Sequence, residues 1–203
     1  MDVREISDGI TPEMVEERYA RGLFPMANPG WGPVITWHCP SHRAIIPLDG
    51  FHISRSLAHT LKKQAFTVTF DHAFDEVMAA CADRGDPEET WISDDIKRVY
   101  AELHGLGKAH SAEVWVDGAL AGGVYGVHFG AAFFAESKFH RVRDMSKVAL
   151  THLVWRLRAH GFQLLEVQYL TPHLERLGAV EVPNRQYRKL LAAALRVKCD
   201  FQR

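Results

Sequence analysis

The spacing of apolar and polar positions predicts several helices in the first half of the chain. Thr11 is a typical N-cap residue, Pro12 suits a first helical position, and Gly22 ends the apolar pattern, so we expect a helix between them. Similar start and stop signals predict helices over residues 54–63, 73–83 and 94–106. Strict alternation over residues 66–70 predicts a strand.

From residue 109 onward the apolar period changes from that of a helix to that of a strand. Three strands, ending near residues 116, 128 and 137, are separated by turn residues and predict an antiparallel meander. A long amphipathic helix follows, with Ser146 as its expected N-cap and Gly161 at its end. The remaining elements are a strand over 164–168, a short helix over 172–177, a strand over 179–182 and a terminal helix from about residue 184.

These elements predict a mixed α+β fold. A meander followed by a long helix and another strand is also the order of the acetyltransferase-like (GNAT) fold, which we expect for residues 64–203. The entry to the long helix, Arg141 to Lys147, lacks the glycine-rich loop that binds coenzyme A pyrophosphate, so the donor is not expected to be acetyl-CoA. Residues 1–63, with many Pro and Gly between 24 and 50, predict a small irregular N-terminal lobe packed by aromatic side chains.

Composition places the 203-residue chain among ordinary globular proteins, with 47% hydrophobic residues. The sequence shows no apolar run of roughly 18–20 residues and no secretory signal pattern, so we expect a cytoplasmic protein without membrane contact. We also expect the protein to be a monomer. Cys39, Cys81 and Cys199 are an odd number with wide spacing, which favours reduced, structural cysteines over disulfides or a zinc site.

The net charge of −1 hides a polarity along the chain. Residues 1–140 hold 12 Lys and Arg against 20 Asp and Glu, whereas residues 141–203 hold 12 against 5. A basic end of this kind can attract a phosphate backbone, although solvated helix faces would produce the same count.

Several polar residues lie beside apolar runs, where an unpaired buried group costs free energy. Glu136 directly follows Phe133, Phe134 and Ala135. Glu166 and Gln168 stand two apart in a predicted strand, so both side chains are expected on one face. By the same alternation His110 and Glu113 point to opposite faces, which argues against a metal site.

Short motifs distributed from about residue 11 to 191 carry a resemblance to a known family. They are YxxGxFPM at 19–26, HISRS at 52–56, TWI at 90–92, HSAEVW at 110–115, GGVYG at 122–126 and HLERLGA at 173–179. The chain resembles the leucyl/phenylalanyl-tRNA–protein transferases. The resemblance implies an enzyme that transfers leucine or phenylalanine from Leu-tRNA or Phe-tRNA to proteins with N-terminal Arg or Lys. The enzyme would bind the aminoacyl-adenosine end of the tRNA, and the transfer would mark the acceptor protein for degradation.

The resemblance also implies roles for particular residues. Gln168 would hold the attacking amino group, and Glu166 would polarise it and relay its proton. The amino-acid pocket and donor contacts would be formed by Trp91, Tyr100, Val124, Phe133, Ala135, Glu136, Leu153 and Thr171. Independently of the resemblance, the positive charges of Lys138, Arg141, Arg143 and Lys147 could hold the tRNA end through phosphate contacts. Trp37 could stack on the terminal adenine of the tRNA, although core packing is an equal alternative for this residue. Because an aminoacyl ester is already activated, no cofactor or metal is expected.

Two departures from the family pattern leave alternatives open. Glu166 stands where the family usually has Asp, and Lys138-Phe139-His140 replaces Met-Phe-Ser. The alternatives are a tRNA-binding descendant without catalysis, or a transferase that uses a different acceptor N-terminus.

Overall fold

The computed structural model describes residues 2–28, 30–83, 85 and 90–202. Its N-terminal part is a three-stranded antiparallel sheet of β1 (Val3–Asp8), β2 (Phe24–Ala27) and β3 (Val34–His38), in the order β1-β3-β2, with α1 (Pro12–Ala20) beside it. The small N-terminal lobe is confirmed, but the prediction that it is irregular was wrong, because it contains a regular sheet. Strands of four to six residues, separated by Pro and Gly, are too short for their alternation to be recognised.

The rest of the chain forms a seven-stranded sheet in the order β10-β4-β9-β8-β7-β6-β5. The strands are β4 (His42–Ile45), β5 (Thr67–Phe70), β6 (Ala109–Val116), β7 (Ala119–Phe129), β8 (Ala132–His140), β9 (Leu164–Glu166) and β10 (Val180–Pro183). Neighbours are antiparallel except β8 and β9, which are parallel and joined through α5 (Met145–Ala159). The mixed α+β class and the expected order of meander, long helix and strand are confirmed.

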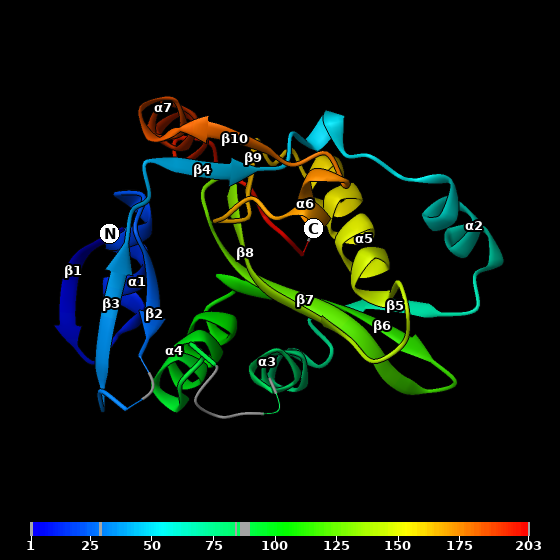
Figure 1. Ribbon diagram of the computed structural model, residues 1–203, viewed down its shortest axis with the longest axis horizontal. Coiled ribbons are helices and arrows are strands. Elements are labelled where there is room, and N and C mark those ends of the chain that lie inside the picture. Colours follow the sequence, from blue (N-terminus) through cyan, green and yellow to red (C-terminus); the bar gives the residue numbers. More distant parts are fainter. Residues whose placement is uncertain (1, 29, 84, 86–89, 203) are drawn as a thin grey trace.

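Helices cover both faces of this sheet (Figure 1). The long helix α5 packs on one face, close to α2 (Arg55–Lys63), and α3 (Phe74–Ala82) and α4 (Asp94–Gly105) lie on the other. The short elements η1 (Leu48–Gly50) and α6 (Pro172–Glu175) and the helix α7 (Asn184–Ala194) complete the described elements. Since β4 belongs to the large sheet, the change from one sheet to the other falls between β3 and β4, earlier than residue 63.

The start of α5 differs from the expectation. Asp144, with φ of 68°, occupies the N-cap position, its carbonyl accepts from Val148 N at 3.0 Å, and its side chain binds Lys147 Nζ at 2.7 Å. Ser146 lies inside the helix and caps nothing. A left-handed Asp is unusual, which is why the sequence favoured the serine.

Candidate active site

The site lies where two neighbouring strands separate. The parallel pairing of β8 with β9 ends at Phe134 opposite Glu166. Beyond that point β8 continues to His140, whereas the chain after β9 stays bonded to β4, through Val167 N to Ala44 O at 2.9 Å and Ala44 N to Gln168 O at 3.0 Å. The two strands therefore diverge and leave room for a ligand between them.

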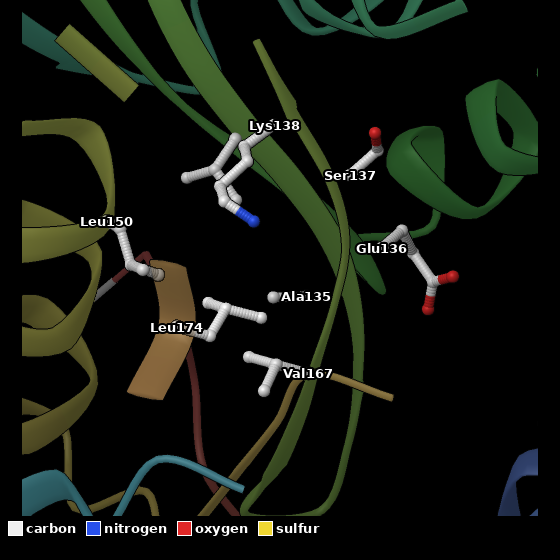
Figure 2. A pocket seen from close by; sticks show the side chains of 8 residues that line it. Ala135, Glu136, Ser137, Lys138, Leu150, Val167 and Leu174 are labelled. Atoms are coloured by element: carbon white, nitrogen blue, oxygen red, sulfur yellow. The ribbon is translucent and has the colours of Figure 1, made fainter. Parts of the chain in front are cut away.

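A depression occupies this divergence. Its inner part is mainly apolar and is lined by Val124, Ala135, Glu136, Ser137, Lys138, Leu150, Val167 and Leu174 (Figure 2). Its wider outer part shares five of these residues and adds Trp91, His140, Ser146, Gln168, Tyr169, Thr171 and His173. An apolar interior that ends at a few convergent polar groups is typical of a small-molecule site.

A β-bulge sets the direction of Glu136. Tyr125 pairs with Ser137 and Gly126 pairs with Ala135, so Glu136 is the extra residue of β8. Figure 2 shows Glu136 and Ser137 pointing away from the apolar group around Ala135, whereas Lys138 points back toward it. A Cβ at Gly126 would lie 2.1 Å from Phe134 O, so only glycine permits this close approach of β7 to the bulge.

Glu136 is held in a buried hydrogen-bond network. Tyr19 Oη donates to Glu136 Oε1 at 2.6 Å and lies 2.9 Å from Tyr100 Oη, and Gln168 Nε2 donates to Glu136 Oε2 at 2.9 Å. Only 6% of Glu136 is exposed, and burial raises its pKa from 4.5 to about 8, against the opposing effect of the Tyr19 hydrogen bond. The carboxyl therefore titrates near neutral pH.

This raised pKa predicts a pH-dependent stability. Between pH 4.5 and about 8 the folded state binds more protons than the unfolded chain, so the free energy of unfolding falls as pH rises through this window. Glu136→Gln removes this titration. We therefore expect the melting temperature of the variant, relative to that of the wild type, to increase as pH rises from 5 to 9. Thermal denaturation at each pH measures this. Glu17→Gln, at an exposed carboxylate of α1, is the control, and parallel curves for Glu136→Gln and wild type would contradict the assignment.

Gln168 adopts a strained backbone conformation. Its φ is 62°, in the left-handed region that non-glycine residues rarely occupy. Two contacts hold it there: its N–H donates to Glu166 Oε1 at 2.7 Å, and its carbonyl accepts from Ala44 N at 3.0 Å. The strain directs the amide toward Glu136. The prediction that Glu166 and Gln168 share a strand face was wrong, because β9 ends at Glu166.

Glu166 is paired with an arginine that sequence reasoning missed. Arg43 donates through Nε and Nη2 to Glu166 Oε1, at 3.0 and 2.8 Å, and through Nη1 to Gly22 O at 2.5 Å. The guanidinium lies 4.8 Å from the ring centroid of Phe24 and 4.4 Å from that of Tyr187. Both charged side chains are fully buried. Arg43 directly precedes the apolar run from Ala44 to Ile46, and a charged residue beside such a run is the signal that could have found it.

The surroundings of Glu166 separate it from the depression. Burial raises its pKa, and the charge of Arg43 opposes this rise. Among the described residues its Oε2 has no hydrogen-bond partner, and Glu166 does not line either part of the depression. Glu166 contacts Gln168 by accepting a hydrogen bond from its backbone N–H.

Comparison with known proteins now identifies the family. A family model described as leucyl/phenylalanyl-tRNA protein transferase matches residues 45–192, and one described as the N-terminal domain of that transferase matches residues 8–41. Curated proteins named leucyl/phenylalanyl-tRNA–protein transferase align with almost the whole chain. The protein from Nitrobacter winogradskyi is 50% identical over 96% of this chain and 87% of its own length. The protein from Cereibacter sphaeroides is 52% identical over 95% and 88%.

The chain belongs to the leucyl/phenylalanyl-tRNA–protein transferase family. Solved structures that resemble it are more distant. A ribosomal-protein-alanine N-acetyltransferase from Brucella melitensis has a TM-score of 0.37 and 18% identity, over 50% of this chain and 78% of its own. L-PGS from Bacillus licheniformis has a TM-score of 0.43 and 12% identity, over 84% and 57%.

The structure brings most of the expected pocket residues of this family member together. Val124 and Ala135 line the inner part, Trp91 and Thr171 line the outer part, and Tyr100 stands behind Tyr19. Phe133 and Leu153 do not line the depression and lie in the core with 1% exposure each. Their places are taken by side chains that the sequence did not single out, namely Leu150, Val167 and Leu174.

The structure places some of the expected tRNA contacts near the depression and buries or engages others elsewhere. Lys138 lines both parts of the depression, and Lys147 and the exposed Arg143 lie at the entry to α5. Arg141 donates to Leu120 O at 3.1 Å and packs 5.4 Å from the Phe139 ring centroid. Trp37 cannot stack on the terminal adenine as predicted, because it is fully buried, with its Nε1 donating to Ser7 Oγ at 2.9 Å.

Positive charge gathers around one side of the depression. Burial lowers the pKa of His173, and the nearby charges of Lys138, Lys147 and Arg176 lower it further. His140 contributes to the same effect. His173 and Arg176 lie in the HLERLGA motif but received no role from the sequence. Their position beside Lys138 extends the basic surface from β8 to α6.

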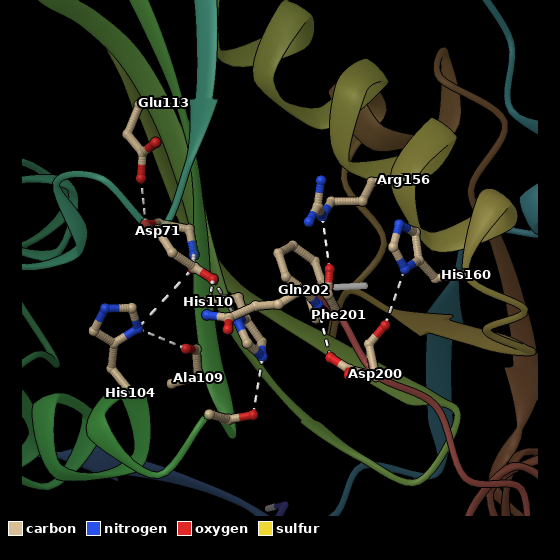
Figure 3. A network of polar contacts seen from close by, with 12 residues as sticks. Asp71, His104, Ala109, His110, Glu113, Arg156, His160, Asp200, Phe201 and Gln202 are labelled. Atoms are coloured by element: carbon tan, nitrogen blue, oxygen red, sulfur yellow. Dashed lines mark hydrogen bonds and ion pairs between the residues drawn. The ribbon is translucent and has the colours of Figure 1, made fainter.

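The HSAEVW motif has a structural place away from the depression. His110 Nδ1 lies 2.8 Å from Asp71 Oδ2, and its ring stacks on Phe201 at 4.1 Å, as Figure 3 shows for this network. Glu113 accepts from Thr69 Oγ1 at 2.6 Å and from Ser111 Oγ. These contacts join β5, β6 and the C-terminal segment.

The described residues contain neither a candidate metal site nor a helix that could span a membrane. Across those parts of the chain, His, Cys, Asp and Glu nowhere form a group of three that could hold a metal ion, and Cys39, Cys81 and Cys199 form no disulfide bonds there. Where helices are described, none has the length and apolar character needed to cross a membrane.

Proposed function

We propose that this protein transfers leucine or phenylalanine from its charged tRNA to the N-terminal Arg or Lys of an acceptor protein, which marks the acceptor for degradation. Family membership supports the donor and the reaction class. The geometric observation that carries the proposal is the strained Gln168, whose amide meets Glu136 at the end of an apolar pocket. Charged tRNA is found in the cytoplasm, where we propose that the protein acts as a monomer.

The apolar inner part would hold the donor side chain. Val124, Ala135, Leu150, Val167 and Leu174 offer aliphatic contacts without a fixed polar partner, which suits leucine or phenylalanine. Such a wall discriminates by shape, and one methylene changes binding by only about 1–3 kcal/mol. We therefore propose a loose preference among unbranched-at-Cβ apolar residues. The donor site would be completed at its rim by Trp91 and Thr171. Tyr100 would support it from behind, through its contact with Tyr19.

Gln168 is the residue that we assign to the attacking amine. Its Nε2 is engaged with Glu136, so its carbonyl oxygen is oriented to accept a hydrogen bond from the amino group of the acceptor. The nitrogen attacks the ester carbonyl carbon, a C–N bond forms, and the C–O bond to the terminal ribose breaks. Holding both groups in this arrangement converts a bimolecular step into an effectively unimolecular one.

Glu136, rather than Glu166, is the proton acceptor that we propose. The pKa of an α-amino group is about 7.7–8.0, close to the value of about 8 for Glu136, so proton transfer between them is nearly balanced. The proton lost by the attacking amine passes to Glu136 and then to the departing ribose oxygen. The same carboxyl is the contact that we propose for the amino group of the donor. Glu166 acts through Gln168 as a positioning residue.

The basic side of the depression would hold the tRNA end. Lys138, His140 and His173 line it, and Lys147 and Arg176 add charge nearby. Phosphate contacts of this kind orient a nucleic acid without reading its sequence. Arg141 and Arg143 would extend the contact toward the acceptor stem, with binding that weakens as salt rises.

A transfer assay tests the proposed function directly. The purified protein, given Leu-tRNA and a peptide that begins with Arg, should form the Leu-Arg peptide. An identical peptide with an acetylated N-terminus is the control. Measurable tRNA binding without product, for Leu-tRNA and Phe-tRNA alike, would establish the non-catalytic alternative. Product with peptides that begin with Asp or Glu, and none with Arg or Lys, would establish the other acceptor.

A further inference from the structure

A tyrosine at the rim of the depression packs against the N-terminal sheet. Tyr169 directly follows Gln168, lines the outer part of the depression and is 37% exposed. Its ring meets that of Phe24 edge to face, with 5.7 Å between centroids. Its hydroxyl donates to Asp2 Oδ2 at 3.1 Å. This rim is therefore built jointly by the β9–α6 connection and the start of the small sheet.

Asp2 brings a negative charge to this rim. Its backbone is tied down by Cys39 N, which donates to Asp2 O at 2.7 Å, and its carboxylate is held by Tyr169. No salt bridge between described residues includes Asp2. Its neighbour His38 is kept neutral, because burial lowers the His38 pKa more than the charge of Asp2 raises it. The charge of Asp2 thus stands without a cationic partner among the residues described.

The other polar side of the depression has the opposite charge. Lys138, His140 and His173 line it, and the influence of Lys147 on the His173 pKa places a further cation close by. A cationic side chain that enters the depression is repelled there and attracted by Asp2. The basic side of the depression therefore favours a phosphate-bearing ligand, and the side with Asp2 favours a cationic one.

Resting on the proposed function, we infer that Tyr169 and Asp2 form the subsite for the basic side chain of the acceptor's first residue. With the acceptor amine at Gln168, the side chain of the first residue lies along the neighbouring Tyr169. The ring face suits a guanidinium or an ammonium. The side chains of arginine and tyrosine are of similar length, so the cationic end arrives near the carboxylate that the tyrosine hydroxyl holds. Tyr169 and Asp2 are specificity residues in this arrangement and take no part in the chemical step.

The test separates charge from shape at the acceptor's first residue. Acceptor peptides that begin with Arg and with citrulline have nearly the same shape, but only Arg is cationic. Wild type and Asp2→Asn, both with C-terminal affinity tags, are assayed for KM and kcat with each peptide. We expect Asp2→Asn to raise the KM for the Arg peptide about fivefold, as for a partly exposed ion pair, and to leave the KM for citrulline and for Leu-tRNA unchanged.

Three further variants control the interpretation. Tyr169→Phe keeps the ring but releases Asp2, and should give a smaller rise in the same KM. Asp2→Lys should give a larger rise than Asp2→Asn, because repulsion replaces attraction. Asp8→Asn, at the other end of β1, should behave as the wild type. Melting temperatures are measured for all of them to confirm that they are folded.

The outcomes distinguish this inference from the proposed function. If the wild type forms product but Asp2→Asn keeps the wild-type preference for Arg over citrulline, the subsite is overturned and the transferase assignment stands. An equal rise in KM for both peptides overturns it too, because the effect then does not depend on charge. If the wild type forms no product with any peptide, the proposed function itself has failed.

Discussion

Replacing Gln168 with alanine should lower transfer by a factor of about 100 or more while charged tRNA still binds. The amide is the group that joins Glu136 to the attacking amine, through Nε2 at 2.9 Å from Glu136 Oε2. Alanine keeps the backbone but removes this connection. The basic residues of β8, α5 and α6 are untouched, so binding of the tRNA is expected to persist. Single-turnover transfer and a separate filter-binding measurement report the two effects.

The chain offers a matched control for this variant. Gln64, at the end of α2, is also a left-handed glutamine, with φ of 48°, and it lies far from Gln168 in the sequence and outside both parts of the depression. Gln64→Ala makes the same chemical change on the same kind of backbone and should leave transfer unaltered. If Gln168→Ala loses tRNA binding and transfer in equal measure, Gln168 belongs to the tRNA contact and the assigned role is wrong.

The helices α1 to α7 and the strands β5 to β10 could be predicted because their signals are local. Thr11 accepts from Met14 N at 3.3 Å and begins α1 as expected, and Gly161, with φ of 77°, follows the end of α5. The alternation of β6, β7 and β8 is long enough to be read without knowledge of the neighbours. Each of these signals depends on residues within one turn or one strand.

The features that build the site depend on distant contacts or on unusual backbone. Arg43 and Glu166 are 123 residues apart in the sequence, and the residues around each of them do not indicate that the two form an ion pair. The left-handed conformation of Gln168 contradicts the preference of its residue type and exists because Glu166 and Ala44 hold it. Burial of Trp37 was equally beyond reach, since an aromatic side chain serves a core as well as a stacking surface. Resemblance to a family singled out Glu166 and Gln168, but their geometry depends on contacts that only the fold supplies.

Replacing Arg43 with methionine should destabilise the protein by about 3–5 kcal/mol, because it leaves the buried carboxylate of Glu166 without its cation. Transfer should fall as well, since Glu166 Oε1 both accepts from Arg43 and holds the N–H of Gln168. Chemical denaturation and the transfer assay measure the two losses. One variant alone does not separate a stability effect from a positioning effect, so two double variants are needed.

Arg43→Met with Glu166→Leu removes both charges and should recover most of the stability, as buried ion pairs replaced by apolar side chains often do. Its transfer should stay low, because leucine cannot accept the Gln168 N–H. Arg43→Met with Glu166→Gln also removes the charge but keeps an acceptor oxygen, and should regain transfer relative to the leucine variant. Equal activity in the two double variants would show that Glu166 does not position Gln168. The ion pair would then serve stability alone, and the strain at Gln168 would be maintained by its bond to Ala44.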